Sequence, residues 1–304
     1  MPAGGPDSPT DLSARSWLGA LKDAGREFLA DDALGLAQQV AFSSLLAFFP
    51  AAIFSVALLG LLGVYDDLRS FLAPVAPGDV LQTIDQLQED TGGVGSGLAV
   101  VLGAGGALWA ASGAAAAVIK AVNRAYGREP RRPFWLERLL AMGLVLAGGA
   151  VVAALLLLIV FGGPLGTAIA DSAGLGGAFE LAWGIARWPL AFGALLLFVA
   201  IVYYVAPDAR HRSWRWVTPG SLAGGLGWLA LSALFALYTS FSDSYSQTYG
   251  TLASGIILLL WLQYSAIALL FGAELNAELE RRAAVDAAGG PNAGLVRLGR
   301  RSVA

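Results

Sequence analysis

Residues 251–282 read TLASGIILLLWLQYSAIALLFGAELNAELERR, and no charged side chain precedes Glu274 in this stretch. A helix needs about 20 apolar residues to cross the hydrocarbon core of a membrane, so the stretch predicts a membrane-spanning helix. Its end is unusual, because Glu274, Asn276 and Glu278 follow the apolar run directly. These polar residues either hold helices together or serve a function of their own.

The composition of the whole chain also predicts a membrane protein. Hydrophobic residues make up 57% of the 304 residues and charged residues 13%, whereas soluble domains contain about 25% charged residues. The mean hydropathy is +0.65. The chain has no Cys and one His, which argues against disulfides, thiolate catalysis and most metal sites, so we expect no metal and no cofactor. A net charge of -3 argues against a nucleic-acid partner, which normally meets a basic surface.

Six apolar stretches are long enough to span a membrane, and they predict an all-α bundle of six transmembrane helices. They lie near residues 39–64, 94–119, 139–161, 181–205, 217–240 and 251–275. All of the 19 Lys and Arg residues except Arg69 and Arg187 fall in the N-terminal arm, the second and fourth connections, and the C-terminal tail. Because cytoplasmic connections carry an excess of these residues, both termini are predicted to be cytoplasmic.

We place the transmembrane domain at residues 38–282, between a cytoplasmic arm (residues 1–37) and a disordered basic tail (residues 283–304). The arm contains an expected amphipathic helix that lies along the membrane interface. Its apolar residues at helical spacing are Trp17, Leu18, Leu21, Phe28 and Leu29. A further short helix is expected in the first outer connection, starting at Pro77 and Gly78.

The depth of Glu274 places it near the cytoplasmic boundary of the membrane. It follows Thr251 by 23 residues, or about 35 Å of helix, which is just past a hydrocarbon core of roughly 30 Å. Gln263, Glu274 and Glu278 share one helical face, which we expect to point into the bundle because polar groups are costly towards lipid.

The neighbours of the two glutamates differ. Glu278 has Arg281 and Arg282 within one turn, a normal surface arrangement, whereas Glu274 has only Glu278 as its i+4 neighbour. Glu274 and Asn276 either pin the inner ends of the helices together or form a gate or binding site at a cytoplasmic opening. We favour the first interpretation.

Pro50 interrupts the first span, in the stretch AFSSLLAFFP (41–50). Proline has no backbone N–H, so we expect a bend at this point. A static bend is our favoured interpretation, and a broken helix that lines a solute path is the alternative. Glycines in other spans predict close helix contacts, namely Gly106 in the second span and Gly220 with Gly224 in the fifth.

Several stretches resemble the YihY/BrkB family of membrane proteins. The resemblance is carried by YGTLASGIILLLWL (249–262), GAELNAELER (272–281), AFSSLLAFFP (41–50) and AVNRAYGREPRRPFWLERLL (121–140), and it covers roughly residues 38–282. It implies a six-helix inner-membrane protein of bacteria. Members of this family have been labelled ribonuclease BN or virulence-associated, and transport of lipid or solute has been suggested for them.

The family's pattern falls on polar and packing residues of this chain. Residues that we assign to transport or gating are Pro50, Asn123, Arg124, Gln263, Glu274, Asn276 and Glu278, and those assigned to helix packing are Gly106, Gly220, Gly224 and Gly250. Position along the chain makes Lys120, Arg124 and Arg138 the candidate partners of Glu274, and the resemblance adds Asn123 and Gly250 to the residues found in this way.

Three functional classes remain for such a protein. The first is a transporter or lipid translocase, whose partners are membrane lipids and a lipid or small-solute substrate. The second is a structural or assembly factor of the cell envelope, in which the same polar residues only join helices. A ribonuclease ranks last, because a metal-dependent nuclease needs ligand clusters that a chain with one His and no Cys does not offer. The sequence leaves the substrate and the oligomeric state open.

Overall fold

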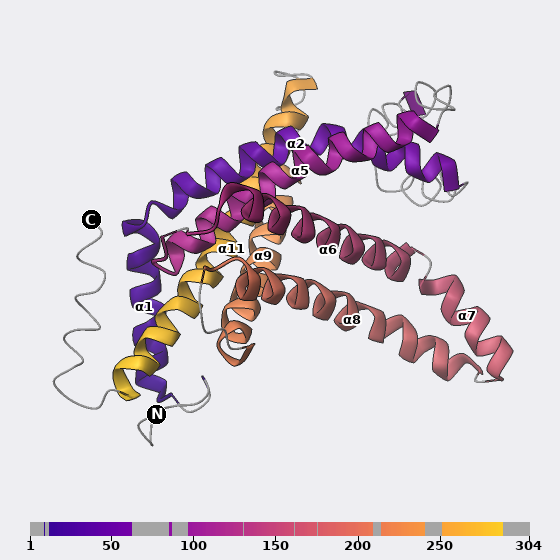
Figure 1. The fold of residues 1–304 in the computed structure, drawn as a ribbon. Coiled ribbons are helices and arrows are strands. Elements are labelled where there is room, and N and C mark those ends of the chain that lie inside the picture. Colours follow the sequence, from indigo (N-terminus) through magenta and orange to yellow (C-terminus); the bar gives the residue numbers. More distant parts are fainter. Residues whose placement is uncertain are drawn as a thin grey trace. The chain divides into compact units, whose positions relative to one another are not determined.

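The structure is a computed structural model, and its secondary-structure elements are helices. It describes residues 9, 12–62, 85–86, 97–129, 131–160, 162–174, 176–208, 214–240 and 251–287. The helices are α1 (Ala14–Ala30), α2 (Ala33–Leu62), α5 (Gly97–Ala125), α6 (Phe134–Val160), α7 (Gly162–Ala173), α8 (Gly176–Val205), α9 (Trp214–Ser240) and α11 (Thr251–Ala287) (Figure 1). These residues contain no strand, so the described part of the chain has the predicted all-α class.

Six of these helices are long and apolar enough to cross a membrane, which confirms the predicted number of spans. The candidate spans are Ala33–Ser55, Gly103–Ala125, Phe134–Ile159, Gly176–Val205, Val217–Tyr238 and Gly255–Val285. The first begins before the expected residue 39, because only a turn at Asp31 and Asp32 separates α1 from α2. α7 is a short helix between the third and fourth spans, and the sequence did not lead us to expect it.

Some expected features lie outside the described residues. They are Gly250, the tail beyond Ala287 and, apart from residues 85–86, the short helix expected after Pro77 and Gly78. α11 itself continues to Ala287, past the expected end of the transmembrane domain at residue 282.

The chain divides into two compact units. The first unit consists of Met1–Phe42, Ala116–Leu140 and Leu196–Ala304, and the second consists of Ser43–Ala115 and Ala141–Leu195. The polar residues near the expected cytoplasmic boundary all belong to the first unit, so its helix contacts position the candidate site.

α1 packs lengthwise against the C-terminal part of α11 (Figure 1). Ser13 caps the start of α1, because its side-chain oxygen accepts a hydrogen bond from the Ser16 N–H at 3.2 Å. Ala20 and Ala24 are fully buried and form an apolar cluster with Leu275 and Leu279 of α11. Small residues let the two helices approach closely.

The packing of α1 separates apolar residues that the sequence had placed on one face. Trp17 packs against the cluster with α11, and the Phe28 ring meets the Phe271 ring edge-on at 6.2 Å. Leu18, Leu21 and Leu29 are exposed instead. The predicted helix is present, but two of its five large apolar residues pack on α11 and three do not, because the packed side also contains Ala20 and Ala24, which the pattern of large residues does not reveal.

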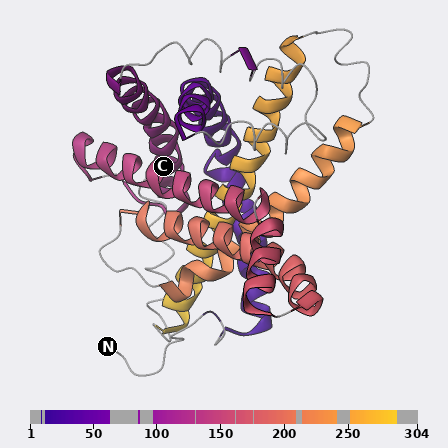
Figure 2. The same ribbon diagram turned by 90° about the vertical axis from the view of Figure 1, so that its right-hand side faces the viewer.

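Glycines set the contact between α9 and α11. A β-carbon at Gly220 would overlap the carbonyl oxygen of Gly272, and one at Gly224 would lie 2.9 Å from the Tyr203 hydroxyl and 3.2 Å from the Ala268 carbonyl oxygen. Backbones that approach this closely leave no room for larger side chains. Figure 2 shows α9 (orange) and α11 (yellow) crossing and then separating towards the end of α9 and the start of α11.

Two tryptophans continue the same contact further along both helices. Trp228 of α9 donates its indole N–H to the Ser265 hydroxyl of α11 at 3.0 Å, and Trp261 of α11 donates to the Ser232 hydroxyl of α9 at 3.2 Å. The two indole rings meet edge-on at 6.1 Å. Each helix therefore supplies one Trp and one Ser four residues apart, and this reciprocal pairing fixes the register of α9 against α11.

We expect Gly220→Ala to lower the free energy of unfolding by about 1–3 kcal/mol, the usual cost of adding volume to a packed site. Gly227→Ala is the matched control, because its β-carbon would lie at an ordinary 3.8 Å from the Ala268 side chain. Both changes replace a helical glycine by alanine, so the gain in helix propensity is shared. Reversible unfolding in bicelles would measure the difference, and equal stabilities would contradict the close crossing at Gly220.

Candidate functional site

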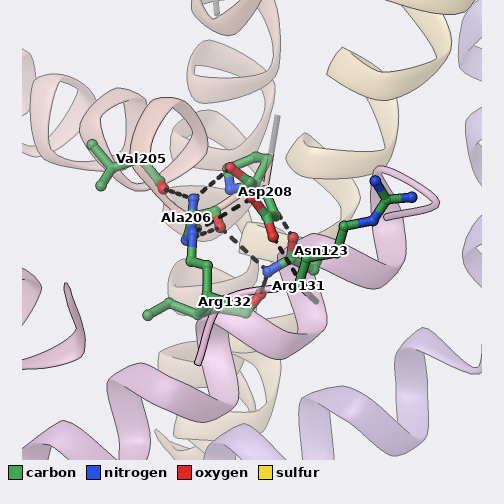
Figure 3. A network of polar contacts seen from close by, with 8 residues as sticks. Asn123, Arg131, Arg132, Val205, Ala206 and Asp208 are labelled. Atoms are coloured by element: carbon green, nitrogen blue, oxygen red, sulfur yellow. Dashed lines mark hydrogen bonds and ion pairs between the residues drawn. The ribbon is translucent and has the colours of Figure 1, made fainter. Parts of the chain in front are cut away.

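The C-terminal end of α8 is held by side chains from α5 and from the segment before α6 (Figure 3). Asn123 of α5 is 3% exposed. Its side-chain oxygen accepts from the Asp208 N–H at 2.8 Å, and its amide nitrogen donates to the carbonyls of Ile119 at 2.9 Å and Ala206 at 3.3 Å. Both polar atoms of the Asn123 side chain are therefore bonded to backbone.

Arg132 completes this contact. Its guanidinium donates to the carbonyls of Ala206 at 3.0 Å, Val205 at 3.2 Å and Pro207 at 2.9 Å. Its Nε lies 3.7 Å from the Asp208 carboxylate, which also accepts from the Arg131 N–H at 2.9 Å. The last carbonyls of a helix have no partner within the helix. A cation at this end also interacts favourably with the negative end of the helix dipole. We call Asn123, Arg132 and Asp208 the α5–α8 clasp.

Asn276 of α11 makes a similar contact with the first turns of α9. This side chain is fully buried. Its oxygen accepts from the Gly220 N–H at 2.6 Å, and its amide nitrogen donates to the Val217 carbonyl at 3.1 Å. Pro219 lies inside α9 and has no N–H, so the backbone hydrogen-bond pattern of α9 is interrupted there. Asn276 supplies hydrogen bonds at this interruption.

Glu278 lies in an ion-pair network between α11 and α1. Its carboxylate contacts Arg281 at 2.9 Å and Arg282 at 3.4 Å. Asp23 of α1 pairs with Arg282, and Glu27 of α1 lies 4.0 Å from Arg281. Glu278 is only 5% exposed, so the surface arrangement expected from its i+3 and i+4 arginines is wrong, because α1 covers this part of α11.

Glu274 is buried in α11, two residues before Asn276, and is 2% exposed. Two cations of α5 at a similar expected depth contact other residues. Arg124 pairs with Asp31 at 3.6 Å, and Lys120 donates to the Gln39 side chain at 3.4 Å. A buried carboxyl group within a membrane span can take up or release a proton, which the amides of Asn123 and Asn276 cannot do.

The assigned residues fall in both compact units. Gln263 is half-buried in α11, three turns before Glu274. Pro50 and Gly106 belong to the second unit, where α2 continues as a helix past Pro50 to Leu62. No described atom lies within 4 Å of a β-carbon placed at Gly106. All the other assigned residues that the structure describes belong to the first unit, namely Asn123, Arg124, Gly220, Gly224, Gln263, Glu274, Asn276 and Glu278.

Sequence reasoning missed Arg132 and Asp208 of the clasp, and also the buried Tyr203 and the half-buried Tyr126. Arg132 had been counted only as one of many cytoplasmic cations. Tyr203 is 1% exposed, donates to the Leu269 carbonyl at 2.5 Å, and fills the space beside Gly224. Burial raises the pKa of the Tyr126 hydroxyl well above its ordinary value, and the Glu280 carboxylate raises it further, so this phenol stays protonated.

Comparison with known proteins identifies the family. The family model described as virulence factor BrkB matches residues 24–295, which include the clasp, the buried glutamates and Asn276. The chain belongs to the BrkB family. The putative ribonuclease-like protein YfkH of Bacillus subtilis is 30% identical over 263 residues, covering 86% of this chain and 95% of that protein.

A second relative has a name that states no activity. The UPF0761 membrane protein IL2447 of Idiomarina loihiensis is 26% identical over 275 residues, covering 86% of this BrkB-family chain and 91% of that protein. No solved structure matches the chain. These similarities agree with the family resemblance seen in the sequence and establish a multi-pass membrane protein.

We expect Arg132→Gln to destabilise the protein by about 2–4 kcal/mol, because it leaves carbonyls at the end of α8 and the Asp208 carboxylate without their charged partner. Arg131→Gln is the matched control, since Arg131 is exposed and only its backbone N–H bonds Asp208. The control should stay within about 0.5 kcal/mol of the unmodified protein. Thermal unfolding in detergent would measure both, and an equal loss in both variants would rule out the capping role of Arg132.

Proposed function

We propose that this BrkB-family protein moves a lipid or a small solute across the membrane, and that Glu274 acts on the path. The observation that carries the proposal is the burial of this ionisable side chain, 2% exposed, inside the sixth candidate span. Charged residues within membrane spans are costly, and they commonly mark substrate or ion pathways and proton relays.

Prolines inside the spans favour the same proposal. Pro50 lies in the interior of α2 and Pro189 in the interior of α8. Each removes one backbone hydrogen bond and leaves a carbonyl that a neighbouring group or a solute can satisfy. Both helices continue through their prolines, and a carbonyl freed in this way within a membrane helix can line a cavity that a solute enters.

The second candidate is a structural or assembly factor of the envelope, and a specific observation favours it. Asn123, Asn276 and Arg132 direct their polar atoms to backbone groups at helix ends. Side chains used in this way join helices and need no substrate. The two candidates predict different effects of removing the Glu274 charge. A transporter should lose transport, and a structural factor should lose stability.

We propose no enzymatic activity for the chain. The word ribonuclease appears in the name of the Bacillus subtilis relative, and it applies to that protein. Here the composition argues against it, because one His and no Cys offer few of the nitrogen and sulfur ligands that metal-dependent hydrolases use.

Loss of transport in Glu274→Gln, with an unchanged unfolding temperature, is the result that we expect. The change keeps the shape of the side chain and removes its ability to ionise. Purified protein in liposomes would be assayed for lipid scrambling and for ion flux, with Glu129→Gln as the control because Glu129 is exposed outside the spans. If the unmodified protein moves neither lipid nor ions and Glu274→Gln only lowers the unfolding temperature, the structural candidate is favoured.

We also propose that the protein lies in the bacterial inner membrane with both termini in the cytoplasm, as the distribution of Lys and Arg indicates. The chain has no Cys, so single introduced cysteines can report the side on which they lie. In intact spheroplasts, an impermeant maleimide should label Ser172→Cys in α7 and leave Glu129→Cys unlabelled until the cells are opened. Both positions are exposed. The reverse pattern would invert the orientation.

A further inference from the structure

α1 carries its acidic and its basic side chains on different sides of the helix. On the side facing α11, the two acidic residues of the helix, Asp23 and Glu27, pair with Arg282 and Arg281. Gly19 permits this, because a β-carbon there would overlap the Arg282 guanidinium. Both acidic side chains of α1 are therefore paired with arginines of α11.

The opposite side of α1 carries exposed leucines and cations. The leucines are Leu18 (70% exposed), Leu21 (48%) and Leu29 (69%), and the exposed cations are Arg15, Lys22 and Arg26. At 3.6 residues per turn these six side chains occupy one half of the helix, and neither acidic residue lies in that half. This side combines an apolar stripe with positive charge, the pattern of helices that lie in the interface of a membrane.

The connection to α2 holds α1 at the boundary of the membrane. The first candidate span starts at Ala33, and α1 ends at Ala30. Asp32 in the intervening turn has a φ of 54°, and the chain changes direction sharply there (Figure 1). A helix that is joined by so short a turn to a membrane span, and that leaves it sideways, stays within reach of the lipid headgroups.

We propose that the outward side of α1 binds the anionic lipid headgroups of the membrane that the six helices span. Leu18, Leu21 and Leu29 enter the boundary between headgroups and acyl chains, and Arg15, Lys22 and Arg26 contact the phosphates. α1 thus joins the end of α11 to the lipid surface. Charge complementarity and the direct link to the first span favour lipid over a protein partner, and the inference does not depend on transport.

The depth of α1 is tested with nitroxide labels on single cysteines, in the full chain reconstituted into vesicles of equal parts phosphatidylcholine and phosphatidylglycerol. Labels at Leu18→Cys and Leu29→Cys should show a ratio of oxygen to nickel-chelate accessibility at least about threefold above that at Glu129→Cys. Glu129 is the control because it is exposed in the connection between α5 and α6. Equal ratios at all three positions would mean that this side of α1 faces water or a protein partner, and would overturn the proposal.

The charge requirement is tested with spin-labelled phosphatidylglycerol and phosphatidylcholine in the same vesicles. The selectivity of the protein for phosphatidylglycerol should fall at least about threefold in Lys22→Gln/Arg26→Gln, because cations near an anionic surface each add to its attraction. Arg128→Gln/Arg131→Gln removes the same charge from exposed side chains outside α1 and should leave the selectivity unchanged. An equal fall in both pairs, or no fall in the first, would overturn the proposal.

Discussion

The backbone at the end of a membrane helix sets the main constraint on this fold. The last carbonyls of a helix have no partner of their own, and next to the hydrocarbon core little water is available to replace one. At the end of α8, Arg132 bonds three successive carbonyls and Asn123 bonds one of them as well. Arg132 lies just before α6 and Asn123 near the end of α5, so three helix ends are fixed by one set of hydrogen bonds. A planar guanidinium suits this arrangement, and a lysine could not reproduce its fork of donors.

α11 contacts α9 and α1 by different means along its length. Along its apolar part it packs against α9 through glycines and through Trp228 and Trp261. The indole N–H groups of both tryptophans are hydrogen-bonded to serines of the facing helix. Near its C-terminal end it meets α1 through a small apolar cluster and through Arg281 and Arg282, which pair with Glu27 and Asp23. Ion pairs are costly in hydrocarbon but tolerable at the boundary, where the charged groups keep access to water. The contacts of α11 therefore change along the helix, from close apolar packing on α9 to ion pairs with α1 near the expected membrane boundary.

The sequence predicted the six spans and the polar boundary, because apolar length and charge are properties of each segment alone. It also singled out Gly220 and Gly224, whose spacing marks a close contact whatever the partner. It did not predict the role of Arg132, since that role depends on carbonyls more than 70 residues away. Nor did it separate Phe28 from Leu29, because the side of α1 that packs on α11 is built mainly from Ala20 and Ala24, which a pattern of large apolar residues does not mark.

The geometry also divides the polar residues that the sequence had grouped as one site. Asn123 and Asn276 use both polar atoms of their side chains on backbone groups. Either residue would have to release those groups before it could bind a solute, and each buried group left unpaired costs about 1–3 kcal/mol. Glu274 differs in kind, because its carboxylate can change its charge without breaking the hydrogen bonds that Asn276 makes to α9. A transport role for these residues therefore depends on Glu274, whereas the asparagines join helices.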